Sequence, residues 1–210
     1  MPYCARKHQL MNSLLYHVYS RGNARAEIFH SDGDYKYFKT LLIEYGRRFN
    51  IKVYHWVIMP NHYHLLLELA DPEVISKCMA GLSRTYACYH HRIYHTAGFL
   101  WQGRFKLQPV QKEDYMITCG RYIERNPVRA KIVTIAEEYL YSSARYYCLG
   151  RPDGLTTESI YYAEFGAETA QRRLEYSQFL QAFDEEQEMS FNNMEQPRGN
   201  KEFILKLIKQ

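Results

Sequence analysis

The chain has 210 residues and is 46% hydrophobic by composition, which is enough to bury a full core and excludes a disordered or fibrous protein. Its five cysteines form an odd count without a CxxC pair, which argues against a disulfide framework or a zinc ribbon. No apolar run approaches the roughly 20 residues that span a bilayer, and the N-terminus lacks the layout of a signal peptide. We therefore expect a cytoplasmic protein without a membrane partner.

Charge is distributed unevenly along the chain. Residues 1–150 hold 20 Lys and Arg against 12 Asp and Glu, a net charge of +8, whereas residues 151–210 have a net charge of −4. A basic first part is typical of a protein that meets a polyanion. The 20 tyrosines suit stacking on unpaired bases, although for any single tyrosine a half-buried core position is the more common role.

The first predicted strand covers residues 14–20, which are rich in β-branched and aromatic side chains and are followed by turn-forming Arg21-Gly22-Asn23. A helix is predicted over residues 34–49, where large apolar side chains recur at helical spacing. Ser31 or Asp32 is suited to cap its N-terminus.

A hairpin follows, with strands at residues 51–59 and 62–69 joined by a tight turn at Pro60-Asn61. Alternate side chains of a strand share a face, so His62 and His64 point the same way. Two neutral imidazoles that converge on one point can hold a divalent metal, and a metal beside a basic surface commonly activates phosphate esters. An incidental or structural HxH pair is the ordinary alternative.

Pro72 opens a second helix that continues towards His95, and residues 99–110 are predicted as a fourth strand. A third helix begins near Lys112 and stops before Asn126-Pro127, because proline disfavours helical geometry in the residue before it. The order of elements predicts an α+β fold of the ferredoxin-like split βαβ type, an antiparallel sheet with helices on one face.

The composition changes after residue 150, where Gly150-Arg151-Pro152-Asp153-Gly154 interrupts the chain. Amphipathic stretches at about 167–183 and 201–208 follow. We interpret residues 1–150 as the catalytic domain and residues 151–210 as a small helical appendage.

Tyr115, Cys119, Tyr122 and Asn126 occupy one face of the third predicted helix. A phenol is a poor nucleophile while neutral, but a nearby cation favours the phenolate and the charge that builds up during attack. One of the two tyrosines facing a metal would suit transesterification of a phosphodiester through a 5′-phosphotyrosine link. Core packing is the common alternative for either tyrosine.

Several blocks of this sequence resemble the HUH, single-tyrosine (Y1) transposases, in particular the REP-associated tyrosine transposases related to the IS200/IS605 group. The blocks span about residues 14 to 147 in the family's order. They are Tyr16-His17-Val18, Arg21-Gly22-Asn23, Ile28-Phe29, the run from Met59 to Leu66, Trp101-Gln102-Gly103-Arg104-Phe105, Tyr115, and the run from Arg121 to Ala130.

The resemblance implies an HUH endonuclease fold and Mg²⁺- or Mn²⁺-dependent cleavage and joining of single-stranded or hairpin DNA, such as a REP element. It places His62 and His64 at the two metal-binding histidines and Tyr115 at the nucleophile. Cys119 stands at the position of the third metal ligand. A thiol is a soft ligand that suits Mg²⁺ poorly, so water, Asn126 or Glu124 are alternatives, with Glu124 expected on the opposite face of the helix.

Arg21, Arg104, Lys106 and Arg121 are candidate DNA-binding residues, since cationic side chains bind phosphate and guanidinium also stacks on bases. Ordinary surface charge is the alternative. A catalytically weak or inactive DNA-binding module derived from such a transposase is the second hypothesis for the function, and a metal hydrolase acting on a small phosphoester is a weaker third. We expect a nucleoid-associated monomer or homodimer.

Overall fold

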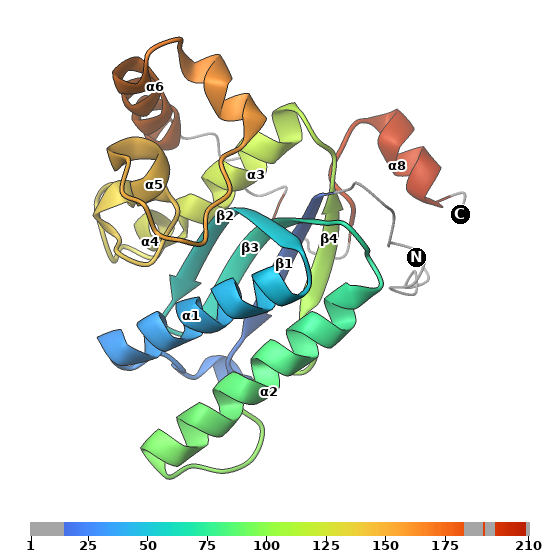
Figure 1. The fold of residues 1–210 in the computed structure, drawn as a ribbon, viewed down its shortest axis with the longest axis vertical. Coiled ribbons are helices and arrows are strands. Elements are labelled where there is room, and N and C mark those ends of the chain that lie inside the picture. The colour runs from blue at the N-terminus through green and yellow to red at the C-terminus, as the bar shows by residue number, and fades with distance from the viewer. Residues whose placement is uncertain (1–14, 183–190, 192–195, 209–210) are drawn as a thin grey trace.

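The computed structural model describes residues 15–182, residue 191 and residues 196–208, and its core is a four-stranded antiparallel sheet of order β2-β3-β1-β4 (Figure 1). The strands agree closely with the predicted ones, except that the fourth is shorter. Their bounds are β1 Leu15–Arg21, β2 Ile51–Met59, β3 His62–Leu69 and β4 Lys106–Val110.

Helices cover both faces of this sheet. The α-helices are α1 Asp32–Arg48, α2 Val74–Tyr94, α3 Asp114–Glu124, α4 Asn126–Arg129, α5 Ala144–Leu149, α6 Thr169–Gln181 and α8 Lys201–Ile208. Short 3-10 turns lie at Asn23–Arg25, Ala136–Glu138 and Ile160–Phe165. The order β1-α1-β2-β3-α2-β4 confirms the predicted split βαβ arrangement.

Helices α1 and α2 pack on one face of the sheet, as predicted, and α3 packs on the other (Figure 1). Period-two alternation in β1 explains the separation, because Tyr16 and Val18 face α1 and α2 whereas Leu15 faces α3. The face covered by α3 is the one that also contains His62 and His64, so the candidate site lies between the sheet and α3.

Local signals set the helix ends. Ser31 caps α1 in a capping box, in which its side chain accepts from the Asp34 amide and Asp34 accepts from the Ser31 amide. This confirms one of the two predicted caps. Helix α3 ends before Asn126-Pro127 as expected, and Pro127 lies in the first turn of α4, where its missing N–H has no cost.

The prediction of the fourth strand is wrong for its first half. Residues 99–105 were expected to be extended in the sheet, but they form a loop that hydrogen-bonds to the end of β1, from Asn23 N to Leu100 O and from Gln102 N to Arg21 O. Gly103 adopts a positive φ of 69° in this loop, a conformation that glycine enters without steric cost.

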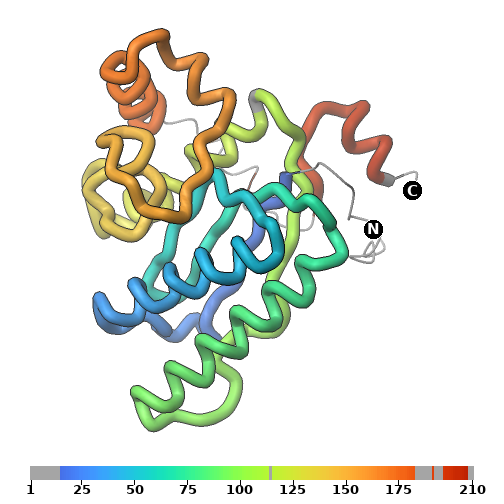
Figure 2. Tube along the Cα trace, in the orientation of Figure 1, coloured from blue at the N-terminus to red at the C-terminus, as the bar shows by residue number. Residues whose placement is uncertain are grey.

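The segment after residue 150 is helical, and it packs closely on the residues before it. Tyr147 and Cys148 of α5 share a buried cluster with Tyr162 and with Tyr176 of α6. At the other edge of the sheet, residues 196–200 run beside β4, where Arg198 forms a parallel bridge with Val110 (Figure 2). In the described part of the chain, no helix is long and apolar enough to cross a membrane.

Candidate active site

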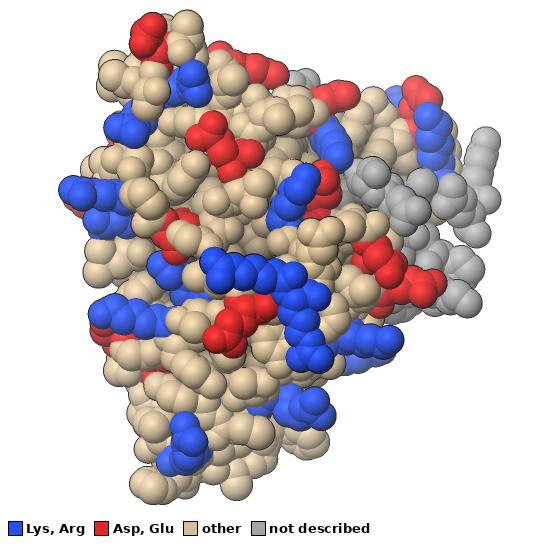
Figure 3. Space-filling view, in the orientation of Figure 1, with Lys and Arg blue, Asp and Glu red and all other residues tan. Residues whose placement is uncertain are grey.

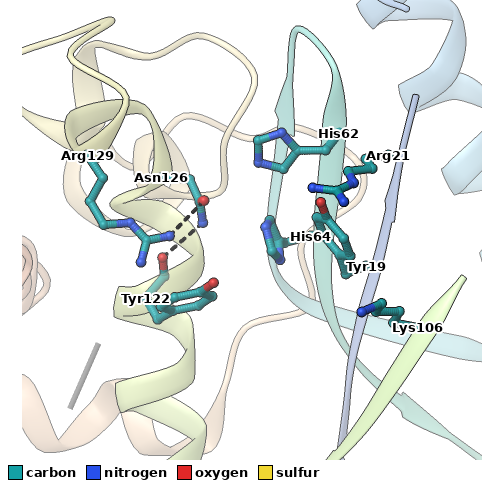
Figure 4. A pocket seen from close by; sticks show the side chains of 8 residues that line it. All are labelled: Tyr19, Arg21, His62, His64, Lys106, Tyr122, Asn126 and Arg129. Atoms are coloured by element: carbon teal, nitrogen blue, oxygen red, sulfur yellow. Dashed lines mark hydrogen bonds between the residues drawn. The ribbon is translucent and has the colours of Figure 1, made fainter. Parts of the chain in front are cut away.

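A cavity of about 300 Å³ lies between the sheet and the helices α3 and α4 (Figure 4). Among the residues that the structure describes, its lining combines aromatic, imidazole, amide and cationic side chains and includes no carboxylate. The lining residues are Tyr19 and Arg21 of β1, His62 and His64 of β3, Lys106 of β4, Tyr122 of α3, and Asn126 and Arg129 of α4.

The sheet register brings the strand side chains of this cavity together. Strands β1 and β3 pair so that Tyr19 lies opposite His64 and Arg21 opposite His62. Residues that face each other across antiparallel strands share a face of the sheet. The HxH pair and alternate residues of β1 therefore form one wall.

His64 is buried and hydrogen-bonded to a second histidine. The distance from His64 Nδ1 to His17 Nε2 is 2.7 Å, and His17 Nδ1 lies 3.1 Å from Gln108 Oε1. Burial lowers the pKa of His17 to about 4 against an opposing effect of the Gln108 hydrogen bond. Burial also holds the pKa of His64 well below its usual value, helped by the neighbouring His17 and His62. Both rings are neutral at pH 7.

His62 lies nearer the surface at the turn of the hairpin. Its Nδ1 is 2.5 Å from Asn61 Oδ1. Burial lowers the pKa of His62 to about 4; a hydrogen bond with Asn126 opposes this effect, and the positive charges of Arg129 and Arg21 add to it. The cavity thus presents two neutral imidazoles, whose ring centroids are 5.2 Å apart.

The helical wall is held by contacts between α3 and α4. The ring of Tyr122 packs edge-on against His64 at 5.7 Å, and the Arg129 guanidinium lies 4.2 Å above the Tyr122 ring. Arg129 Nη2 donates to Asn126 Oδ1 at 2.8 Å, while Asn126 Nδ2 donates to the Tyr122 carbonyl at 3.0 Å. Asn126 therefore has a fixed amide orientation, with its oxygen towards Arg129 (Figure 4).

Comparison with known proteins identifies the family. The model of the IS200-like transposases matches residues 10–126, more than half of the chain. The chain belongs to the IS200-like transposase family. This finding confirms the resemblance seen in the sequence and supports a transposase-type enzyme. No curated protein sequence matches the chain.

A comparison with solved structures gives two matches, of which the first shares the fold. The structure of a REP-associated tyrosine transposase bound to a REP hairpin is 16% identical, with a TM-score of 0.55, and the match covers 72% of this chain and 89% of the other. A proposed transposase from Deinococcus radiodurans R1 is 19% identical with a TM-score of 0.41, covering 58% of this chain and 87% of the other.

The two tyrosines of α3 take different places in this IS200-like transposase. Tyr122 lines the cavity, whereas Tyr115, two helical turns earlier, is half-buried against the apolar cluster under α3 and is not among the lining residues. Tyr115 lies near Arg198, in the segment beside β4, and burial lowers the pKa of that guanidinium. The structure therefore brings one phenol of α3 to the histidines, and it is not Tyr115.

Cys119 and Glu124 point away from the cavity. Cys119 is fully buried in the apolar cluster under α3, and this burial raises the pKa of its thiol well above the usual value. Glu124 accepts from Ser143 Oγ and from Tyr176 OH, on the side of α3 that faces α5 and α6, as expected from its helical position. Neither position favours a metal ligand, whereas Asn126 lies beside His62.

The candidate DNA-binding residues separate into three groups. Arg21 and Lys106 line the cavity, and Arg104 is exposed in the loop before β4. Arg121 is buried: its guanidinium lies 4.6 Å from the Phe179 ring and donates to the Ala182 carbonyl at 3.2 Å. Arg121 thus packs α3 against α6, on the side opposite the cavity.

Sequence reasoning missed four residues of the site. Tyr19 and Arg129 line the cavity, and His17 and Gln108 lie directly behind His64. The alternation of His17, Tyr19 and Arg21 along β1 was a signal that these side chains share one face. Which neighbours they would meet depends on the strand order, and that order is a property of the folded sheet.

The histidines of the cavity supply only two of the ligands that a divalent ion needs. Among the described residues, no three His, Cys, Asp or Glu side chains are arranged to hold a metal. The Nδ1 atoms of His62 and His64 are engaged by Asn61 and His17, so Nε2 is the remaining nitrogen of each ring. Two imidazoles completed by the Asn126 oxygen, water or phosphate suit Mn²⁺, and Mg²⁺ if it keeps several waters.

Proposed function

We propose that this transposase cleaves and rejoins single-stranded DNA at hairpin sites through a 5′-phosphotyrosine intermediate. The observation that carries the proposal is the cavity itself, in which two neutral imidazoles stand among Arg21, Lys106 and Arg129, and the described residues place no carboxylate in the lining. Such a site attracts a phosphodiester by charge and offers it ligand nitrogens and hydrogen-bond donors.

Hairpin DNA is the proposed substrate. The solved REP-associated transposase is bound to a REP hairpin and shares this fold. The cations of the cavity wall suit the phosphate backbone, and the exposed Arg104 extends the basic character beyond the mouth. We propose binding by a monomer or homodimer.

The proposed nucleophile is Tyr115, by its position in the family motif. Its phenolic oxygen forms a bond to phosphorus, the bond from phosphorus to the 3′ oxygen breaks, and that oxygen leaves as a 3′-hydroxyl with a proton from solvent while the phenol gives up its own. Since Tyr115 lies outside the cavity, it reaches the phosphate only after α3 is repositioned or from a second copy of the chain. Tyr122 is the phenol already in place.

His62, His64 and Asn126 would hold the divalent ion. When bound, Mg²⁺ or Mn²⁺ supplies a Lewis acid that stabilises negative charge on the phosphate. Arg129 and Lys106 are placed to neutralise the same charge from the cavity walls. Burial keeps both histidines neutral, so that each ring retains one nitrogen lone pair for a ligand bond.

The test is mass spectrometry of the protein after incubation with labelled hairpin DNA and Mn²⁺. We expect an adduct on Tyr115, abolished in Tyr115→Phe with DNA binding nearly unchanged. Tyr122→Phe is the matched control, because it removes a phenolic hydroxyl from the same helix. An adduct on Tyr122 would instead assign the nucleophile to the phenol in the cavity.

The second candidate is a DNA-binding module without catalysis. It is favoured by the lack of a three-ligand metal group among the described residues and by the burial of Cys119. It predicts salt-sensitive hairpin binding with no adduct on either tyrosine at any Mn²⁺ concentration. Cleavage that is lost equally in His62→Ala and His64→Ala would exclude it.

A further inference from the structure

A chain of hydrogen bonds crosses three strands behind the cavity. It runs from the Gln196 carbonyl to the Gln108 side chain of β4, on to His17 of β1, and then to His64 of β3. The sheet register explains this path, since Gln108 is paired directly with His17 and His64 lies diagonally across the β1–β3 ladder. Of the four residues in this series of hydrogen bonds, His64 is the one that lines the cavity.

The first bond fixes the orientation of the Gln108 amide. Gln108 Nε2 lies 2.8 Å from the Gln196 carbonyl oxygen. Only the NH₂ group can face a carbonyl, because the amide oxygen in that place would put two acceptors in contact. The Oε1 atom must therefore point to His17 Nδ1, at 3.1 Å.

The orientation of Gln108 determines where the imidazole protons are. An amide oxygen only accepts, so His17 Nδ1 has the proton, and in the neutral ring His17 Nε2 is then an acceptor. His64 Nδ1 lies 2.7 Å from that acceptor and must donate to it. The proton of neutral His64 is thus on Nδ1, which leaves a lone pair on Nε2.

We propose that His17 and Gln108 are positioning residues that hold His64 in the tautomer whose Nε2 can bind a divalent cation. The proposal rests on the proposed function for the identity of the bound group. It also gives the segment at residues 196–200 a role. The Gln196 carbonyl fixes the orientation of the Gln108 amide, and this orientation determines the proton positions on His17 and His64. Hydrogen-bonded outer partners of this kind typically change metal affinity 10- to 100-fold.

The direct test needs neither metal nor DNA. Long-range ¹H–¹⁵N NMR of the full-length, metal-free protein at neutral pH reports which nitrogen of each imidazole is protonated. We expect Nδ1–H and unprotonated Nε2 for both His17 and His64. A proton on His64 Nε2 in the wild-type protein would overturn the proposal.

Substitutions test the consequence for metal affinity, measured as Mn²⁺ binding by electron paramagnetic resonance. His17→Leu removes the acceptor for His64, and we expect about a tenfold loss of affinity together with a shift of His64 towards the Nε2–H tautomer. His17→Gln keeps an amide oxygen that can accept from His64 and should restore most of the affinity. Gln108→Leu should weaken binding in the same direction as His17→Leu.

Two controls separate this role from general damage to the fold. Gln111→Leu alters the contact of Gln111 Oε1 with the Asn200 amide on the same segment but leaves Gln108 intact, so Mn²⁺ affinity should be unchanged. His91→Gln removes a histidine that bonds to Thr96 and Gly98 instead. Equal affinity and tautomer in the wild type and folded Gln108→Leu would contradict the proposal.

The outcomes also distinguish this proposal from the proposed function. If His64 shows the expected tautomer but no DNA adduct forms with Mn²⁺, the function fails and the positioning role remains. If adducts form while His64 has its proton on Nε2, the function stands and the positioning role fails.

Discussion

At the scale of single residues, burial lowers the pKa values of His17, His62 and His64. His17 has no exposed surface, and it satisfies both ring nitrogens through Gln108 and His64. These are the contacts of a core histidine whose hydrogen bonds are satisfied within the protein. Its partner, however, is one of the two candidate metal ligands, which makes a core contact part of the site.

The histidine pKa values predict how stability depends on pH. The pKa of His17 is about 4 in the folded protein, and the ordinary value is 6.5. Between these two pH values His17 is protonated in the unfolded chain but not in the folded protein. The contribution of neutral His17 to the free energy of unfolding is therefore fully present above pH 6.5, and about 3 kcal/mol of it is lost as the pH falls to 4. His62 adds a loss of the same sign.

Urea unfolding in the presence of EDTA, at pH 7.5, 6, 5 and 4, measures this dependence. The His17→Gln variant should show a shallower loss of unfolding free energy, because one of the buried rings is gone. His91→Gln, at a partly exposed site, should keep the slope of the wild type. A wild-type free energy of unfolding that stays constant from pH 7.5 to 5 would show that the buried histidines do not titrate as described.

At the scale of elements, helix α3 joins two different environments. The face with Tyr122 meets the cavity, and the face with Arg121 and Glu124 meets α5 and α6. Helical spacing predicted that Tyr115, Cys119 and Tyr122 share a side. It did not predict that over two turns this side passes from the apolar cluster to the cavity.

Gly120 permits the close approach of α3 to β2. A Cβ atom at this position would lie 2.7 Å from the His55 ring, which is buried and bonded to Glu124 Oε1 at 2.9 Å. We expect Gly120→Ala to destabilise the fold by about 1–3 kcal/mol through overpacking. Thermal and urea unfolding measure the effect.

Gly46→Ala is the matched control, because Gly46 lies within α1 and an added Cβ would have the Ile51 carbonyl oxygen as its nearest described neighbour outside the helix, at 3.5 Å. It should be neutral or stabilising by about 0.5–1 kcal/mol, as is usual for glycine replaced in a helix interior. A Gly120→Ala protein as stable as the wild type would mean that α3 and His55 are less tightly packed than the structure indicates.

At the scale of the whole molecule, the positive charge of the first 150 residues does not form a purely basic patch on every face. The face formed by α1 and α2 shows Lys and Arg interspersed with Asp and Glu (Figure 3). The cavity on the opposite side of the sheet has Arg21, Lys106 and Arg129, and no carboxylate of the described part of the chain lines it. The electrostatic potential for a phosphate is therefore expected to favour the cavity side.

The salt dependence of hairpin binding tests this distribution. Each phosphate contact on a single strand contributes about 0.7 to the slope of log K against log salt. Arg21→Gln and Lys106→Gln should each weaken binding and reduce the slope by about that amount, as measured by fluorescence anisotropy over a range of NaCl concentrations.

The control is Lys206→Gln on α8, an exposed cation that is paired with Glu202 at 2.9 Å. It should leave both the affinity and the slope unchanged. A uniform effect of all three substitutions would indicate that DNA contacts the molecule broadly and does not centre on the cavity.

The sequence by itself determined the family, the order of strands and helices along the chain, and the HxH pair, since these depend on local spacing and on motifs. Strand bounds such as Ile51–Met59 and His62–Leu69 agree fully, because turn residues and alternation mark them locally. The tertiary structure alone decided which residues surround the histidines. His17, Gln108 and Arg129 are far from His64 in the chain, and they lie around it only because the sheet order β2-β3-β1-β4 and the packing of α3 and α4 bring non-local segments together.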